Sequence, residues 1–124
     1  MRVLITGSNG QLGSEIKELA TNYKKLNFIY KDLPDLDICN FKVLYAFIAD
    51  NNIDAVINCA AYTSVDKAEE ESIIATQVNY EGVLNIVKAL ESVNGKLIHI
   101  STDYVFDGNH FLPYKENDPV SPCG

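Results

Sequence analysis

A glycine-rich turn directly after the first apolar run constrains the fold of this chain more than any other feature. Residues 3–5 read Val-Leu-Ile, and residues 7–13 read Gly-Ser-Asn-Gly-Gln-Leu-Gly. A buried strand, a glycine turn and a helix N-terminus form a phosphate cradle, because glycine lets a ligand approach and the first helical N–H groups face it. The spacing is G-x-x-G-x-x-G, whereas the common dinucleotide fingerprint is G-x-G-x-x-G. The position after the first strand nevertheless predicts a nucleotide-binding turn.

The composition is that of a globular domain, and it narrows the partners that the chain can have. The 124 residues suffice for one domain, with 47% hydrophobic and 22% charged residues. A net charge of −7 argues against nucleic acid and against an anionic membrane as the main partner. The initial apolar run is too short for a signal peptide or a membrane span. Three cysteines without C-x-x-C spacing indicate reduced thiols, so we expect a cytoplasmic protein.

Hydrophobic periodicity predicts that strands and helices alternate along the chain. We expect strands over residues 2–6, 26–31, 55–60 and 96–101. We expect helices over residues 11–22, 41–50 and 72–92, the second of them capped by Asn40. Residues 36–38 are ambiguous, because a strand there would lie too close to residue 31 for a crossover helix. Residues 107–124 hold three prolines and two glycines and are expected to form a long loop.

This alternation predicts an α/β fold with a doubly wound parallel sheet and helices on both of its faces. The first strand is then central, and the strand over residues 55–60 lies beside it. The carboxyl ends of the strands bring three segments to one crevice, namely residues 7–13, 59–63 and 101–104. The first helix is expected to carry an apolar stripe on one face, made of Leu12, Ile16, Leu19 and Tyr23.

Acidic residues after the second predicted strand could select the cofactor. Asp32 follows that strand, and a carboxylate there can accept hydrogen bonds from an adenine ribose diol, which favours NAD over NADP. Lys31 beside it would suit a 2′-phosphate instead. A solvated pair of turn residues is the simpler interpretation of both. Asp37 is a second candidate for the adenosine end of the crevice.

Residues 100–106, Ile-Ser-Thr-Asp-Tyr-Val-Phe, follow the last predicted strand. They place hydroxyls and a carboxylate at the crevice, where Thr102 could hydrogen-bond a substrate carbonyl. The alternative is a strand-ending turn whose Ser and Asp side chains cap backbone groups. His99 is expected to be a hydrogen-bonded interior histidine rather than a catalyst. Four acidic residues cluster where the third helix is expected to begin, namely Asp66, Glu69, Glu70 and Glu71. They are expected to be solvated side chains at the helix start rather than ligands of a metal ion.

Four segments together resemble the extended short-chain dehydrogenase/reductase superfamily, and within it the dTDP-4-dehydrorhamnose reductases. These segments are residues 4–13, 36–38, 58–69 and 101–108. The first is shared across the superfamily, whereas A-Y-T-x-V-D-K-A-E and S-T-D-Y-V-F-D-G are more specific. The resemblance implies a Rossmann-type domain over residues 1–124. It also implies reduction of dTDP-4-dehydro-L-rhamnose to dTDP-L-rhamnose with NADPH or NADH.

The resemblance further assigns roles to individual residues. The residues implied in cofactor binding, from the pyrophosphate through the adenosine to the nicotinamide ribose, are Gly10, Gln11, Leu12, Asp37, Ile38, Ala61, Tyr62, Thr63 and Ile100. Gly7, Gly13 and Asp32 are cofactor-binding candidates from their positions in the glycine turn and after the second strand. Thr102 matches the catalytic Ser/Thr and, with Asp103, would contact the substrate, beside a loop over residues 107–124 on the active-site side. Glu15 matches a magnesium ligand that some members place at a dimer interface. A homodimer is therefore expected, whereas no metal site is predicted.

The chain departs from the family pattern at the proton donor. The family uses a Tyr-x-x-x-Lys pair, and no tyrosine of residues 1–124 has a lysine four positions on. A threonine hydroxyl is too weak an acid to replace that tyrosine. We therefore expect the amino-terminal part of an enzyme, without the last strands and the sugar-nucleotide domain, that binds cofactor weakly and does not turn over. Alternatives are a sugar-nucleotide epimerase or dehydratase, or an NAD(P)-binding regulatory subunit resembling that of methionine adenosyltransferase.

Overall fold

The chain folds around a parallel β-sheet. The computed structural model describes residues 1–64, 67, 71–102, 105–109 and 111–122. The strands of the sheet among these residues are β1 (Arg2–Thr6), β2 (Asn27–Lys31), β3 (Ala55–Asn58) and β4 (Lys96–His99), and their spatial order is β2-β1-β3-β4. Leu4 of β1 lies opposite Ile29 of β2 and Val56 of β3. The central first strand and the doubly wound arrangement confirm the predicted fold class.

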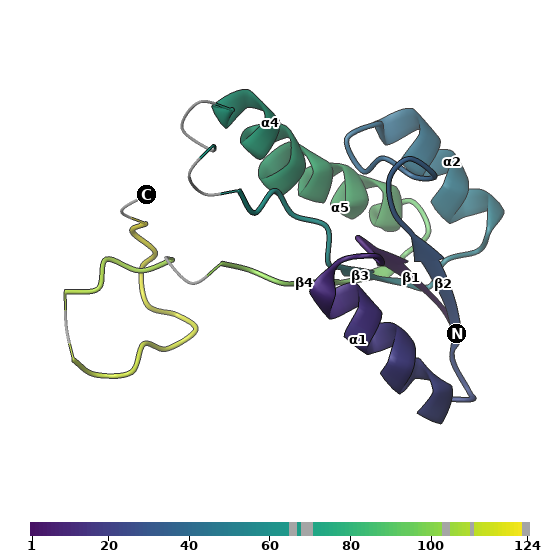
Figure 1. Ribbon diagram of the computed structural model, residues 1–124, viewed down its shortest axis with the longest axis horizontal. Helices are drawn as coiled ribbons and strands as arrows, with labels where there is room; N and C mark the ends of the chain where they lie inside the picture. The colour runs from purple at the N-terminus through teal and green to yellow at the C-terminus, as the bar shows by residue number, and fades with distance from the viewer. Residues whose placement is uncertain (65–66, 68–70, 103–104, 110, 123–124) are drawn as a thin grey trace.

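Helices cover both faces of this sheet (Figure 1). Helix α1 (Gln11–Leu19), prolonged by a 3₁₀ turn, lies on one face, and α2 (Phe41–Asp50) lies on the other. Beside α2 runs a long helical stretch made of α4 (Ser72–Thr76), the π-helical turn η2 (Gln77–Gly82) and α5 (Val83–Glu91). Asn40 caps α2 as predicted, since its Oδ1 accepts the Val43 N–H at 3.3 Å.

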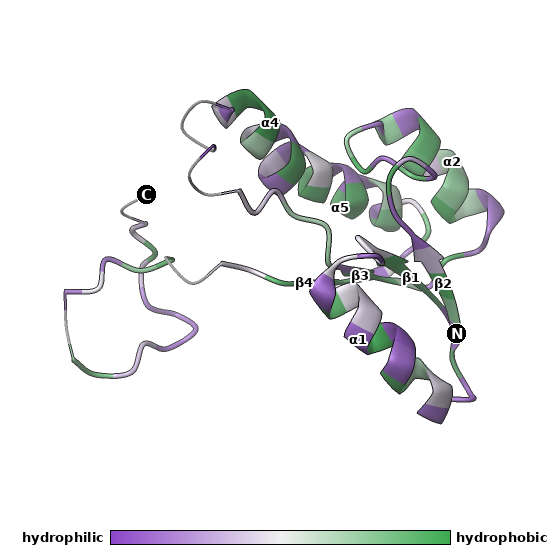
Figure 2. Ribbon diagram, in the orientation of Figure 1, coloured by the Kyte–Doolittle hydropathy of each residue, from purple (hydrophilic) through white to green (hydrophobic). Residues whose placement is uncertain are grey.

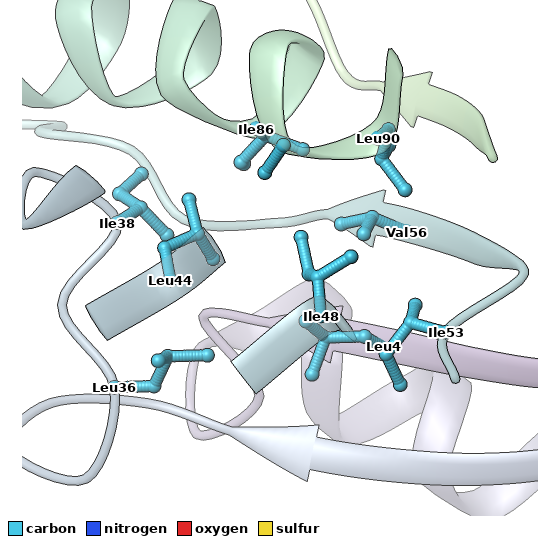
Figure 3. Close-up of a cluster of buried hydrophobic side chains, with 10 residues drawn as sticks. Leu4, Leu36, Ile38, Leu44, Ile48, Ile53, Val56, Ile86 and Leu90 are labelled. Atoms are coloured by element: carbon cyan, nitrogen blue, oxygen red, sulfur yellow. The ribbon is translucent and has the colours of Figure 1, made fainter. Parts of the chain in front are cut away.

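The main core lies between the sheet and the pair α2 and α5 (Figure 3). Leu4 and Val56 reach it from the strands, Leu44 and Ile48 from α2, and Ile86 from α5. Apolar residues at helical spacing give α2 and α5 their hydrophobic faces (Figure 2). On the opposite face of the sheet a smaller cluster joins Val3, Ile5 and Ala55. No helix among the described residues is long and apolar enough to cross a membrane.

The structure resolves residues 36–38, which the sequence left ambiguous, as a turn rather than a strand. Leu36 and Ile38 both bury their side chains in the main core, and Asp37 Oδ1 accepts the Cys39 N–H at 2.8 Å. The expected apolar stripe of α1 is largely exposed: Leu12, Leu19 and Tyr23 are 40%, 59% and 57% exposed. Among the described residues α1 is the one helix on its face, so the outer part of this stripe has no helix to pack against.

The segment after β4 leaves the body formed by the sheet and the helices (Figure 1). Its described residues close on themselves, since the Ser121 N–H donates to the Val105 carbonyl at 3.0 Å. The ring of Phe106 stacks on that of Tyr114 with centroids 4.2 Å apart, and the Tyr114 hydroxyl donates to Asp107 at 2.9 Å. The segment is thus a compact loop with its own internal contacts.

Replacing Leu44 with Ala should lower the free energy of unfolding by about 2–5 kcal/mol, because the fully buried side chain would leave a cavity. Val43→Ala is the matched control on the same helix turn; Val43 is 47% exposed, so about 1 kcal/mol or less is expected. Denaturant unfolding of both variants measures the difference. Equal losses would contradict the described orientation of α2.

Candidate functional site

A cleft of about 350 Å³ opens at the carboxyl ends of the strands. Its walls are the glycine turn after β1, the turn after β2, the segment after β3, and the side of α4 and η2. Of the residues predicted to bind cofactor, those lining it are Gly7, Gly10, Asp32, Asp37, Ile38, Ala61 and Tyr62. This is the crevice that the strand order predicts for a nucleotide. The other residues predicted to bind cofactor are described by the structure but do not line the cleft; they are Gln11, Leu12, Gly13, Thr63 and Ile100.

The glycine turn is shaped by two close backbone approaches. Gly7 has a φ of +63°, and a Cβ there would lie 2.5 Å from the Ala60 nitrogen. A Cβ on Gly13 would lie 2.5 Å from the Gly7 carbonyl oxygen. Gly10 is the N-cap of α1 and carries no side chain to satisfy the first N–H groups of that helix. These residues therefore form a cradle with exposed backbone donors, which fits a pyrophosphate.

Asp32 bridges the glycine turn and the end of β2. Its Oδ2 accepts the Asn9 N–H at 2.7 Å, and its Oδ1 accepts the Leu33 N–H at 2.8 Å. The carboxylate is thereby held at the cleft, where its free lone pairs can accept further hydrogen bonds. Lys31 does not line the cleft, because its Nζ lies 3.8 Å from Asp35 and 5.6 Å from the centre of the Phe47 ring. Asp32 and Lys31 thus have separate surroundings.

Asn58 joins the ends of β1, β3 and β4. Its buried Oδ1 accepts the Thr6 hydroxyl at 2.6 Å and the Ala60 N–H at 3.2 Å. Its Nδ2 lies 3.1 Å from His99 Nδ1, which acts as the acceptor because an amide NH₂ is a donor only. His99 is hydrogen-bonded as predicted, but it is exposed rather than interior, because β4 is an edge strand of the described sheet.

Tyr62 is held at both its backbone and its hydroxyl. Its N–H donates to Asn79 Oδ1 at 2.8 Å, and its carbonyl accepts from Asn79 Nδ2 at 3.0 Å. Its hydroxyl donates to the Glu71 carboxylate, and this hydrogen bond, with partial desolvation, raises the pKa of the Tyr62 phenol. Glu71 does lie at the start of α4, as its N-cap, but the sequence did not predict its hydrogen bond to Tyr62. Asn79 was missed as a site residue, although an asparagine inside a helix is a signal of a specific hydrogen bond.

Two thiols also line the cleft, those of Cys39 and Cys59. Burial raises the pKa of both, and at Cys39 the nearby carboxylates of Asp37 and Glu81 add to the effect. Both thiols are therefore neutral at physiological pH and act as small apolar wall residues. Cys59 is partly buried and packs against the smaller cluster beside Val3 and Ile5.

The segment after β4 contributes no wall to the described cleft. Thr102 is exposed and is not among the lining residues, and Asp103 lies outside the described residues. Glu15 is exposed on α1. Of the predicted acidic cluster, Asp66, Glu69 and Glu70 also lie outside the described residues. Within the described part of the chain, no three His, Cys, Asp or Glu side chains gather as metal ligands would.

Comparison with known proteins agrees with this architecture. The chain matches the RmlD substrate binding domain family over residues 1–124. A dTDP-4-dehydrorhamnose reductase of Aggregatibacter actinomycetemcomitans is 40% identical over 98% of this chain and 41% of its own length. The crystal structure of a dTDP-4-dehydrorhamnose reductase from Clostridium acetobutylicum has a TM-score of 0.93 and 44% identity over 98% of this chain and 43% of its own. Its Bacillus anthracis counterpart, solved in complex with NADP, has a TM-score of 0.91 and 39% identity over the same shares. The chain thus spans about two fifths of the length of these curated relatives.

Gly7→Ala should lower the free energy of unfolding by about 2 kcal/mol or more, because an L residue in the left-handed region costs about 1–2 kcal/mol and the new Cβ meets backbone atoms of Ala60. Gly108→Ala separates the two causes, since Gly108 has a φ of +68° with open space around it. Thermal unfolding of both variants measures them. A Gly7→Ala protein as stable as Gly108→Ala would show that the close approach to Ala60 does not matter.

Proposed function

The chain belongs to the RmlD substrate binding domain family, and from this premise we propose that its cleft binds NADPH or NADH for the reduction of dTDP-4-dehydro-L-rhamnose to dTDP-L-rhamnose. The names of the relatives support the reaction, and the NADP complex of the Bacillus anthracis protein supports the cofactor. The observation that carries the proposal is the cleft itself, with the glycine turn at the N-terminus of α1 on one side and an acidic side chain at the end of β2 on the other. As in the sequence-based expectation, the unpaired thiols of Cys39 and Cys59 support a reducing compartment such as the cytoplasm.

The glycine turn would hold the pyrophosphate of the dinucleotide. The N–H groups of Gln11 and Leu12, at the start of α1, would receive the pyrophosphate, because the helix dipole and free donors favour an anion there. The Gly10 N–H donates to the Gly7 carbonyl at 3.1 Å, so Gly10 would contribute close approach of the ligand rather than a donor. Close packing at Gly7 and Gly13 keeps this turn in shape. Gly10 has no Cβ at the mouth of the cradle, so a phosphate group can approach the backbone there closely.

The two ends of the cofactor would lie against the other walls. Asp32 would accept hydrogen bonds from ribose hydroxyls, with Asp37 and Ile38 beside the adenine. Ala61, Tyr62 and Thr63 would line the middle of the dinucleotide, and Ile100 would lie under the nicotinamide ribose. When bound, the reduced nicotinamide supplies a hydride to the carbonyl carbon of the sugar.

The substrate would be held by the segment after β4. The Thr102 hydroxyl would hydrogen-bond the sugar carbonyl and Asp103 would contact the substrate, beside the loop over residues 107–124. A threonine hydroxyl cannot protonate the resulting alkoxide efficiently at neutral pH, because its pKa is far above that of a tyrosine phenol. Residues 1–124 contain no Tyr-x-x-x-Lys pair to do so. We therefore propose that these residues alone bind cofactor without completing the reaction.

Binding of the cofactor is tested by titrating the chain with NADH and NADPH and following nicotinamide fluorescence. Saturable binding is expected, and Gly10→Asp should raise the dissociation constant at least about tenfold, because a carboxylate in the cradle repels the pyrophosphate. Asn22→Asp adds the same charge at the far end of the helical segment that begins with α1. It should change the dissociation constant less than about twofold, because that distance exceeds the screening length. Equal effects of both variants, or no binding by the unmodified chain, would contradict the proposal.

Turnover is tested by adding dTDP-4-dehydro-L-rhamnose to residues 1–124 with NADH or NADPH and recording absorbance of the reduced nicotinamide. No oxidation above the protein-free rate is expected, because the chain has no tyrosine–lysine proton donor. The control is a complete reductase of the same family under the same conditions. Measurable sugar reduction by residues 1–124 alone would overturn this part of the proposal.

A further inference from the structure

The helical stretch from α4 through η2 to α5 contacts two walls of the cleft through asparagine side chains. Asn79 holds the segment after β3, and Asn85 holds the segment after β2. We infer that Asn79 and Asn85 are positioning residues that set cofactor affinity by fixing the backbone of these two walls. The identity of the ligand in this inference rests on the proposed function.

Asn79 replaces a missing strand neighbour for Tyr62. Tyr62 lies beyond the end of β3, so its backbone N–H and carbonyl have no partner from a sheet ladder. The Asn79 amide supplies both, accepting the N–H at 2.8 Å and donating to the carbonyl at 3.0 Å. Of the ordinary side chains, only those of Asn and Gln offer a donor and an acceptor in this reciprocal geometry. The orientation of the Tyr62 peptide, and with it the wall at Ala61 and Tyr62, is therefore set from the helix.

Asn85 fixes the opposite wall by donating twice. Its Nδ2 lies 3.0 Å from the Ile38 carbonyl oxygen and 3.2 Å from the Cys39 carbonyl oxygen. The same wall touches the helix at two further points: Cys39 Sγ lies 3.4 Å from the Gln77 carbonyl oxygen, and a Cβ on Gly82 would lie 2.8 Å from the Ile38 side chain. The segment 38–39 thus rests directly on the helical stretch, without room for a larger residue at position 82.

The two asparagines show how one helical stretch serves both walls. The Asn79 amide holds the Tyr62 backbone, whereas the Asn85 amide holds the carbonyls of Ile38 and Cys39. Asn79 lies within the π-helical turn η2 and Asn85 within α5, and π-helical turns recur at functional sites. The helical stretch consequently lies between the two segments and fixes the distance between them.

A purely structural role would predict a different result from a positioning role. Removing a side-chain hydrogen bond anywhere lowers stability, whereas only a bond that shapes the cleft changes cofactor affinity. Asn51 provides the matched control, because its Nδ2 donates to the Phe47 carbonyl at 2.8 Å at the end of α2. Its own carbonyl accepts from the Arg2 guanidinium at 2.6 Å, which places it near the start of β1, at the opposite edge of the sheet from the cleft.

The experiment compares Asn79→Ala, Asn85→Asp and Asn51→Ala with the unmodified chain. Asn85→Asp keeps the shape but turns a donor into an acceptor facing two carbonyls. Both cleft variants should raise the dissociation constant for NADH about fivefold or more, while Asn51→Ala leaves it unchanged within about twofold. Melting temperatures measured without cofactor show how much stability each variant loses. Unchanged affinity in both cleft variants, with losses of stability like that of Asn51→Ala, would overturn the inference.

Amide hydrogen exchange without cofactor tests the positioning itself. The Tyr62 N–H should be protected in the unmodified chain and in Asn51→Ala, and should lose that protection in Asn79→Ala. If the unmodified chain binds neither NADH nor NADPH, the proposed function fails, and this measurement alone then decides the positioning claim. Equal protection of Tyr62 in Asn79→Ala and the unmodified chain would overturn it in either case.

Discussion

The junction between the ends of β1 and β3 is the constraint on which the site depends. There the Gly7 backbone approaches Ala60 so closely that no Cβ fits. One residue earlier Thr6 and Asn58 pair across the two strands and share a buried hydrogen bond of 2.6 Å. This junction fixes the glycine turn relative to the segment after β3 and so creates one corner of the cleft. A larger residue at Gly7 would push apart two strand ends that the buried core holds together.

The rest of the cleft is built from short polar contacts rather than from regular structure. Asp32 ties the end of β2 to the glycine turn through the Asn9 N–H. Asn79 and Asn85 tie the other two walls to the same helical stretch. Backbone segments beyond the ends of strands lose their sheet partners, and these side chains supply the missing donors and acceptors. The cleft can therefore keep its shape although three of its four walls are loops.

Sequence periodicity predicted the strands, the helices and the glycine turn, because each depends on local spacing and on the burial of one face. It could not predict that Leu36 and Ile38 enter the core without forming a strand, since a turn and a short strand place alternate side chains alike over three residues. Nor could it show that Leu19 stays exposed, because exposure depends on which elements cover that face. Nor could it predict the partners of Asn79 and Glu71, since their hydrogen bonds to Tyr62 form only once the segment after β3 lies beside the helical stretch of α4 and η2.

The central claim is that a nicotinamide dinucleotide binds along the carboxyl edge of the sheet. Amide chemical-shift mapping of isotopically labelled chain during an NADH titration tests it most directly. We predict that the largest shifts fall on residues 7–13, 37–39 and 60–62, which surround the cleft. Residues around Arg2 and Asp54, at the opposite edge, should remain unshifted. Shifts centred on that opposite edge, or on the exposed side chains of α1, would contradict the account.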